Sequence, residues 1–197
     1  MLLFLGSHPA LDFLNTRYGP HGQVVECIGD GRSLVDWLVG AGLVDAAGAT
    51  KMKRRLGQEA LDTASEEARR VREWARGWIA RWAEAPTADY GRELVVLNGL
   101  LGRATSRREV VLSEGRLQLT ESHRIESAEE LLAMVALQIA LLITNEEPAL
   151  IKECASSACT LSFLDRTKSH RRLFCSATVC GNRAKVAAFR ERQRKND

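Results

Sequence analysis

The sequence lacks the common signatures of three enzyme classes: it has no glycine-rich phosphate loop, no nucleophile elbow and no HExxH pattern. We therefore do not expect an enzyme. It also lacks an apolar run long enough to cross a membrane, and residues 1–6 form a short apolar stretch with no basic region before it, unlike a signal peptide. We expect a protein of the cytoplasm with no membrane partner.

Cysteine is present five times, and four of the five lie close together near the C-terminus. Their pattern is C-x4-C-x15-C-x4-C, formed by Cys154, Cys159, Cys175 and Cys180. Two pairs of thiols joined by a loop can place four sulfurs about 2.3 Å from one Zn²⁺. Two disulfides, a redox pair or plain burial are the alternatives, but Cys27 leaves an odd thiol and a reducing compartment disfavours disulfides. We predict a structural zinc ion.

Charge is distributed unevenly along the chain. Residues 151–197 carry 11 Lys and Arg against 4 Asp and Glu, a net charge of +7, which leaves −4 for residues 1–150. A basic C-terminal segment indicates an acidic partner such as nucleic acid.

The segment after the last cysteine, Asn182 to Arg194, has the spacing of a helix. Val186 and Phe189 fall on one face, which we expect to pack against the zinc-binding core. The candidate nucleic-acid contacts are the cations of this helix and of the preceding loop: Arg171, Arg172, Arg183, Lys185, Arg190 and Arg194. Such a helix could lie in the major groove of DNA; RNA as the partner and a merely solvated basic helix are the alternatives.

The first 148 residues are predicted to be mainly helical. The expected elements are short strands at 2–5 and 24–28, helices beginning at Ser33 and spanning 45–56, 59–85, 89–104 and 128–145, the last with a capping box of Ser127 and Glu130, and a hairpin of strands 108–112 and 116–120. Trp74, Trp78 and Trp82 recur every fourth residue, which favours a buried stripe over a stacking surface for bases.

A cluster of polar residues follows the first apolar run: His8, Asp12, Asn15 and Thr16. They could bind a small effector. The alternative is that Asp12 and Asn15 satisfy backbone groups in a turn or a helix cap, as these residue types commonly do.

Residues 154–192 resemble the CGNR zinc-finger family, through Phe163-Leu164-Asp165, the run Arg171 to Cys175 and the tetrapeptide Cys180-Gly181-Asn182-Arg183. One departure is Phe174, where the family often has tryptophan. The upstream run Leu11 to Thr16, LDFLNT, is similar to the LDF-x-NT signature of the ABATE domain. That domain accompanies this finger in bacterial proteins described as stress-induced transcription regulators.

The predicted fold is therefore α+β: a mainly helical domain at 1–148 with short strands and a hairpin, and a small zinc finger of the treble type at 149–197 that ends in a basic helix. We expect a DNA-binding transcription regulator in which the N-terminal domain senses an effector or forms a homodimer. A protein-interaction module and a thiolate redox switch are the alternatives. The sequence names neither the DNA site nor the effector.

Overall fold

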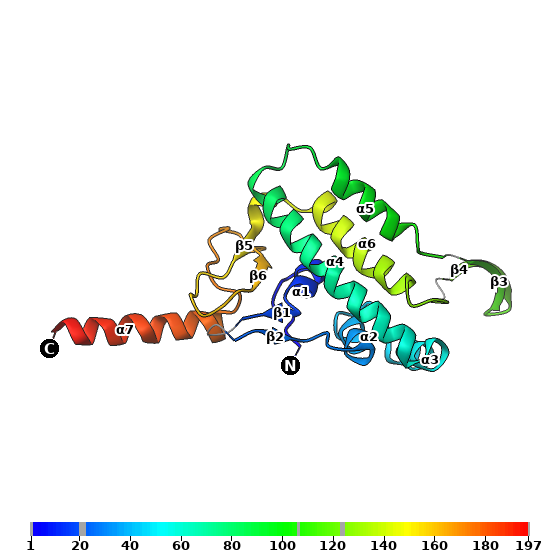
Figure 1. Cartoon of the computed structure of the whole chain (residues 1–197), viewed down its shortest axis with the longest axis horizontal. Helices are drawn as coiled ribbons and strands as arrows, with labels where there is room; N and C mark the ends of the chain where they lie inside the picture. Colours follow the sequence, from blue (N-terminus) through cyan, green and yellow to red (C-terminus); the bar gives the residue numbers. More distant parts are fainter. Residues whose placement is uncertain (1, 20–22, 106, 123–124, 197) are drawn as a thin grey trace. The chain divides into compact units, whose positions relative to one another are not determined.

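The computed structural model describes residues 2–19, 23–105, 107–122 and 125–196. Helices dominate, and three separate pairs of short antiparallel strands accompany them (Figure 1), which confirms the predicted α+β class. The elements in chain order are α1 (Pro9–Leu14), β1 (Arg17–Tyr18), β2 (Val25–Glu26), α2 (Gly31–Gly40), α3 (Ala46–Leu56), α4 (Gln58–Glu84), α5 (Gly91–Leu101), β3 (Arg107–Ser113), β4 (Arg116–Ser122), α6 (Glu130–Asn145), η2 (Pro148–Leu150), β5 (Ile151–Glu153), β6 (Ser162–Leu164), η3 (Ala177–Gly181) and α7 (Asn182–Asn196). No helix among the described residues has the length and apolar character that a membrane span requires.

The chain divides into two compact units that do not follow the order of the sequence. Unit 1 contains Met1–Ile28, Arg72–Ala88 and Leu141–Asp197, and unit 2 contains Gly29–Val71 and Asp89–Ala140. The zinc-finger segment thus shares a unit with the N-terminal residues. The boundary near residue 148, which follows the motifs along the chain, stays a prediction.

Unit 2 is built from helices with a shared apolar core. Its fully buried side chains come from several helices: Leu34, Trp37 and Leu38 of α2 and Leu131, Leu132 and Val135 of α6. Asp30, not the predicted Ser33, caps α2: its carboxylate accepts from the Ser33 N–H at 2.7 Å, and the Ser33 hydroxyl accepts from the Asp30 N–H. Ser33 is therefore the third residue of the helix, where it completes a capping box with Asp30.

The start of α6 also differs from the prediction. Ser127 and Glu130 were expected to form a capping box ahead of a helix from residue 128, but α6 begins at Glu130. Residues 127–129 form a turn in which the Ser127 carbonyl accepts from the Glu130 N–H at 3.3 Å. Glu130 is therefore the first residue of the helix, and its side chain is 7% exposed.

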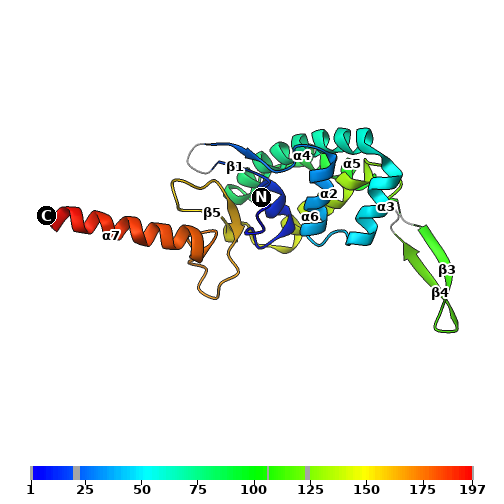
Figure 2. The same cartoon turned by 90° about the horizontal axis from the view of Figure 1, so that it is seen from below.

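The predicted hairpin is confirmed as β3 and β4. Glu114 and Gly115 at its tip have φ values of 50° and 76°, the left-handed backbone that a two-residue turn requires. The register pairs Val110 with Leu119 and Leu112 with Leu117, so all four share one face. Figure 2 shows the ribbon extending away from the helices of unit 2, and these four side chains are 66–76% exposed.

In unit 1, the expected strand at residues 2–5 does not form. Instead these residues run without regular pairing into α1, and the Gly6 carbonyl accepts from the Leu164 N–H of β6 at 2.8 Å. The strand expected at 24–28 is confirmed only as β2, which pairs with the unpredicted strand β1. Residues 20–22, between these two strands, lie outside the described part of the chain.

The tryptophan stripe of α4 is confirmed as core. Trp78 and Trp82 are 2% and 9% exposed, and Trp74 lies against Trp78 with ring centroids 5.3 Å apart. The same half of α4 also buries Arg72, which helical periodicity did not single out. Its side chain is 2% exposed.

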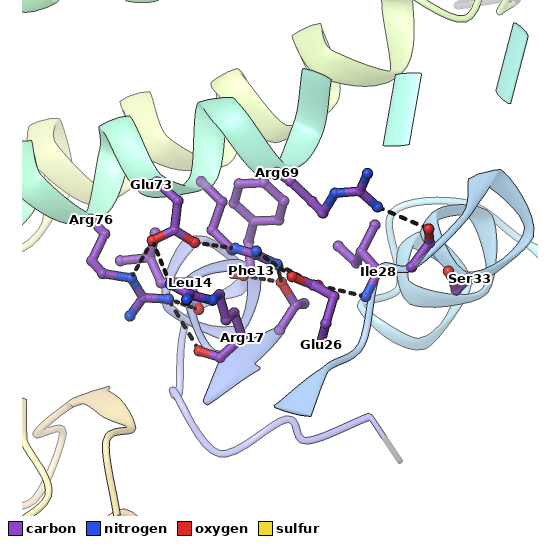
Figure 3. A network of polar contacts seen from close by, with 12 residues as sticks. Phe13, Leu14, Arg17, Glu26, Ile28, Ser33, Arg69, Glu73 and Arg76 are labelled. Carbon is purple, nitrogen blue, oxygen red and sulfur yellow. Dashed lines mark hydrogen bonds and ion pairs between the residues drawn. The ribbon is translucent and has the colours of Figure 1, made fainter. Parts of the chain in front are cut away.

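Arg72 is held by a network of polar groups that includes Glu26 and Glu73; Figure 3 shows Glu26, Glu73 and Arg76 in this network. Its Nη1 and Nη2 donate to the two carboxylate oxygens of Glu26 at 2.7 and 2.6 Å, Nη1 also donates to Thr16 Oγ1 at 3.0 Å, and Nε donates to Glu73 at 2.9 Å. Glu73 in turn lies 3.4 Å from Arg76 Nε. A buried guanidinium is tolerated because its donors are matched by acceptors.

Candidate metal centre and nucleic-acid interface

The four C-terminal cysteines meet at one point. The Sγ atoms of Cys154, Cys159, Cys175 and Cys180 all lie within 4.8 Å of one another, and all four thiols are free of disulfides. The Sγ atom of Cys175 is 3.7 Å from that of Cys159 and 3.7 Å from that of Cys180. A tetrahedron with metal–sulfur bonds of about 2.3 Å has edges of about 3.8 Å, so the sulfur spacing fits zinc.

The raised pKa values of two of the clustered thiols also indicate that a cation is needed to keep all four cysteines deprotonated. Burial and the neighbouring Cys154 raise the pKa of Cys159 to about 11, and burial and the Cys159 thiolate raise the pKa of Cys175. Four thiolates are favoured together only with a divalent cation among them. Because the four sulfurs fill a closed tetrahedral set, the zinc here is structural.

Short backbone segments hold the cysteines in place. Cys154 follows β5 and donates its N–H to the Leu161 carbonyl at 2.9 Å, and the Cys159 N–H donates to the Ser156 carbonyl in a turn. Leu161 and Phe163 form an apolar patch beside the cysteines and are 3% and 0% exposed. Leu3, Leu5 and Tyr18 pack against this patch, so the N-terminal segment completes the core of the finger.

Gly181, the glycine of the Cys180-Gly181-Asn182-Arg183 tetrapeptide, ends the π-helical turn η3, and its N–H donates to the Ser176 carbonyl at 2.9 Å. A Cβ at this position would lie 3.6 Å from the Ser176 carbonyl oxygen, an ordinary contact, and the φ of Gly181 is not in the left-handed region. Neither a close approach of the backbone nor a special backbone conformation therefore requires glycine here.

Asp165 organises the loop between the two cysteine pairs. Its carboxylate accepts from Lys152 Nζ at 2.7 Å, Thr167 Oγ1 at 2.6 Å and the Arg172 N–H at 2.9 Å. Burial alone would raise the pKa of Asp165, but these hydrogen bonds hold it well below its usual range. The carboxylate thus fixes a polar loop that has little apolar surface of its own.

Arg172, predicted as a nucleic-acid contact, lies inside the finger. Its Nε donates to the Phe174 carbonyl at 2.9 Å, Nη2 donates to the Cys175 carbonyl, and Nη1 donates to Ser7 Oγ at 3.1 Å. The guanidinium also stacks 4.3 Å from the centroid of the Phe163 ring. These contacts occupy the side chain within the fold, and we leave Arg172 out of the interface proposed below.

The other predicted contacts are at the surface. Arg171 is exposed in the loop, and the remaining four, Arg183, Lys185, Arg190 and Arg194, are exposed along α7. Arg192, which was not among the predicted contacts, is also exposed. Helix α7, the C-terminal helix in Figures 1 and 2, begins at the residue after η3, so the zinc ligand Cys180 lies immediately before this basic helix.

The expected packing of α7 against the zinc core is wrong. Val186 and Phe189 are 49% and 55% exposed. The physical reason is that Leu3 and Leu5 of the N-terminal segment, together with Phe174, already cover Leu161 and Phe163. A finger considered alone needs its helix for that role, whereas this one receives its apolar cover from the other end of the chain.

The four polar residues proposed for an effector make hydrogen bonds within unit 1. His8 Nδ1 accepts from the Ala10 N–H at 3.1 Å, Asp12 Oδ1 accepts from the Gly6 N–H at 2.7 Å, and Thr16 Oγ1 donates to the Phe13 carbonyl at 2.6 Å. Burial also lowers the pKa of His8. These contacts agree with the alternative that the polar side chains of this cluster satisfy backbone groups. Effector binding by the cluster stays a prediction.

Asn15 joins the N-terminal motif to the finger. Its Nδ2 donates to the Ser162 carbonyl at 2.8 Å, and its Oδ1 accepts from the Ser162 N–H at 3.0 Å. The amide thus pairs with one residue of β6 as a neighbouring strand would. Because Asn15 is 1% exposed, water cannot easily replace it.

We predict that Asn15→Ala destabilises unit 1 by about 3 kcal/mol, since the N–H and the carbonyl of Ser162 both lose their partner. Urea unfolding of the zinc-loaded protein measures this. The matched control is Thr160→Val, which removes the exposed 2.8 Å bond from the Gly19 N–H to Thr160 Oγ1 and should cost less than about 1 kcal/mol. Equal losses in the two variants would contradict a special role for Asn15.

Asp12 should make stability depend on pH. Burial raises its pKa to about 6, against the hydrogen bond from Gly6, whereas in the unfolded chain it is near 3.9. The folded state therefore binds the extra proton between these values, so wild-type stability falls as pH rises from about 4 to 6. Asp12→Asn keeps an acceptor for Gly6 but does not ionise. The free energy of unfolding of Asp12→Asn, relative to that of wild type, should rise by about 1–2 kcal/mol between about pH 4 and pH 6 and stay constant above about pH 6. A difference between the two proteins that does not change with pH would contradict this prediction.

Two known protein families match this chain. A sequence profile of the ABATE family, described as "Putative stress-induced transcription regulator", matches residues 7–146. The chain belongs to the ABATE family. A profile of the CGNR zinc finger matches residues 151–193, which agrees with the resemblance of the cysteine segment. No curated protein matches the chain.

The structure gives the LDFLNT signature of the ABATE region a structural role. Asn15 and Thr16 lie in the ABATE match, whereas Ser162, the partner of Asn15, lies in the CGNR match. The two family regions are thus hydrogen-bonded to each other across a buried amide. Both are families of regulators or zinc fingers rather than of enzymes.

Proposed function

We propose that this ABATE protein is a DNA-binding transcription regulator whose zinc finger presents α7 to the major groove. The observation that carries the proposal is the exposed basic face of α7, directly after the zinc ligand Cys180. Arg183, Arg190 and Arg194 are seven and four residues apart, so they lie within one narrow stripe of the helix. Eleven residues of helix span about 16 Å, a length that suits one pass through the groove.

The composition of this surface supports contacts to both phosphates and bases. Lys185 and Arg192 lie on the opposite side of Val186 and Phe189 from the arginine stripe, so exposed apolar side chains run between two rows of cations. Cations neutralise phosphates and can reach guanine edges, and apolar side chains contact thymine methyl groups. The zinc site would fix the start of the helix and hence its direction in the groove.

A protein-interaction module is the second candidate. It is favoured by the exposed apolar side chains of the finger and α7: Leu173, Val179, Val186 and Phe189, at 49–61% exposure. A protein partner would cover these groups. It would bind without the steep salt dependence that phosphate contacts impose.

Selection of sequences from a random duplex pool by the zinc-loaded protein tests the proposal. We expect an enriched motif, weaker retention at about 0.2 M than at about 0.05 M salt, and loss of enrichment in Arg183→Ala/Lys185→Ala. Enrichment of no sequence, together with retention that does not depend on salt, would overturn the proposal and favour the interaction module.

We also propose a homodimer, because small DNA-binding modules commonly occupy two half-sites. The exposed apolar face of the hairpin, Val110, Leu112, Leu117 and Leu119, is a surface that a second copy would cover. A two-fold symmetric motif in the selection and a mass that rises with concentration would support the dimer. A monomer mass at every concentration, both alone and on DNA, would remove it.

A further inference from the structure

The loop that leads to the second cysteine pair carries cations and no acid. It consists of residues 166–171, all of which are exposed, and none of them is Asp or Glu. Arg166 of this loop is paired with Glu146 at 2.5 Å. Lys168 and Arg171 are the other two cations of the loop, and both are turned to solvent. An exposed basic segment without local acids favours an anionic partner.

A buried carboxylate ties this loop together. Asp165 lies directly before the loop and is 0% exposed. Its carboxylate accepts from the Thr167 N–H at 3.1 Å near the start of the loop and from the Arg172 N–H at 2.9 Å just after its end. Lys152 Nζ donates both to this carboxylate and to the His170 carbonyl. Both ends of the loop are thus fixed to one buried group.

The backbone of the loop is also fixed. His170 has a φ of 50°, a left-handed conformation that is uncommon for a residue other than glycine and persists only where the surroundings determine it. Its N–H donates to the Thr167 carbonyl at 3.1 Å, which closes a tight turn with Lys168 and Ser169 at the tip. A loop whose cations only improved solubility would not need this order. A fixed turn reduces the conformational entropy that a loop loses on binding.

The loop and α7 are both connected to the zinc site. Arg171 is four residues before Cys175, α7 begins two residues after Cys180, and the two sulfurs are 3.7 Å apart. Four residues of extended chain span at most about 14 Å. Duplex DNA carries one phosphate charge per about 1.7 Å of its axis. A duplex that lies along α7 therefore has phosphates within reach of this loop.

We infer that Lys168 and Arg171 bind phosphates of the DNA backbone beside the groove that α7 enters, and that Asp165 is the residue that positions them. These contacts rest on the proposed function of α7 and add a second set of contacts to it. Ammonium and guanidinium groups are the usual partners of phosphate oxygens. Phosphate contacts carry no sequence information themselves, but they fix the register of a protein on the duplex. The loop thus orients α7 in the groove.

Fluorescence anisotropy with two labelled duplexes of equal length tests this role. Both contain the motif selected by the wild-type protein, and in one of them neutral methylphosphonate groups replace the phosphates that flank the motif. On the fully charged duplex, Lys168→Gln/Arg171→Gln should bind about 10-fold more weakly than wild type, and the slope of log Kobs against log salt should become shallower by about 2. On the methylphosphonate duplex the two proteins should differ by less than about threefold.

The control for net charge is Arg32→Gln/Arg70→Gln, two exposed arginines of unit 2. This variant should bind both duplexes within about threefold of wild type. Equal salt slopes for wild type and Lys168→Gln/Arg171→Gln, or a loss of affinity that persists on the methylphosphonate duplex, would overturn the role of the loop. A wild-type protein that binds neither duplex would instead overturn the proposed function of α7, on which the loop contacts rest.

Asp165→Asn tests the positioning role. An amide nitrogen replaces one of the two accepting oxygens, so one end of the loop loses its partner, while the four zinc ligands are unchanged. In the wild-type background this change should weaken binding about 3- to 10-fold and make the salt slope shallower. In the Lys168→Gln/Arg171→Gln background it should change neither quantity, because the cations that it positions are absent. Loss of zinc, or an equal loss of affinity in both backgrounds, would show a merely structural role for Asp165.

Discussion

Replacement of Cys175 by serine should remove zinc from the protein and unfold the finger. Cys175 is central in the cluster, with its sulfur 3.7 Å from two others. Structural zinc contributes on the order of 10 kcal/mol to small finger peptides, more than a segment of this size gains from its apolar contacts. Metal analysis should find one zinc ion per chain in the purified wild-type protein and none in the purified variant.

The loss should reach beyond the finger itself. Leu3, Leu5 and Tyr18 pack on its core, and Asn15 pairs with Ser162. Hydrogen exchange should therefore accelerate in residues 2–19 as well as in 151–181, while the core of unit 2 keeps its protection. The matched control is Cys27→Ser, a cysteine outside the cluster, which should keep its zinc. Retained zinc in Cys175→Ser, or faster exchange confined to the finger, would contradict the account.

Removal of the basic stripe of α7 should weaken DNA binding about 100-fold. The variant is Arg183→Gln/Arg190→Gln/Arg194→Gln, which keeps polar side chains on an exposed helix. Each phosphate contact contributes about 0.9 to the slope of log Kobs against log salt, so the slope should become shallower by about 2 to 3. Fluorescence anisotropy with a labelled duplex at several salt concentrations measures both quantities.

The control for net charge removes three other exposed arginines: Arg32→Gln/Arg70→Gln/Arg92→Gln, all in unit 2. It changes the total charge by the same amount but leaves α7 intact. Its affinity should stay within about threefold of wild type and its slope should be unchanged. If both triple variants lost affinity equally, net charge rather than α7 would explain the binding.

Local patterns in the sequence were sufficient for the metal site and for most of the helices. The cysteine spacing predicted the cluster of four thiols, the tryptophan stripe predicted the buried face of α4, and the two short runs at 108–112 and 116–120 predicted the hairpin. In each of these the residues that act together lie close in the chain. Their geometry follows from helix periodicity, turn chemistry or metal-ligand spacing.

The features that the sequence did not predict depend on residues far apart in the chain. Asn15 and Ser162, which are hydrogen-bonded to each other, are 147 positions apart in the sequence, and Arg72 and Glu26 are 46 positions apart. Neither helix periodicity nor the spacing of a motif predicts contacts between residues so far apart in the sequence. The exposure of Phe189 has the same origin, because the finger core is covered by N-terminal residues that the motif analysis assigned to another domain. Arg172 appeared as one more loop cation, yet its donors serve carbonyls of the finger.

The start of α6 was also not predicted correctly. Glu130 was expected in a capping box with Ser127, but α6 begins two residues later than expected, and Glu130 lines a cavity of unit 2. A small change in where a helix starts thus altered the chemistry available to a side chain. Such shifts are common at helix ends, where sequence signals are weakest.

The central claim is that zinc holds the finger so that α7 can bind DNA. The most direct test is the affinity of the full chain for a labelled duplex at about 0.15 M ionic strength, measured with zinc, after removal of zinc by a chelator, and after zinc is restored. The account predicts binding with zinc, loss of binding without it and recovery on its return. Equal affinity in all three states would contradict the account, since the basic helix would then bind without the metal centre.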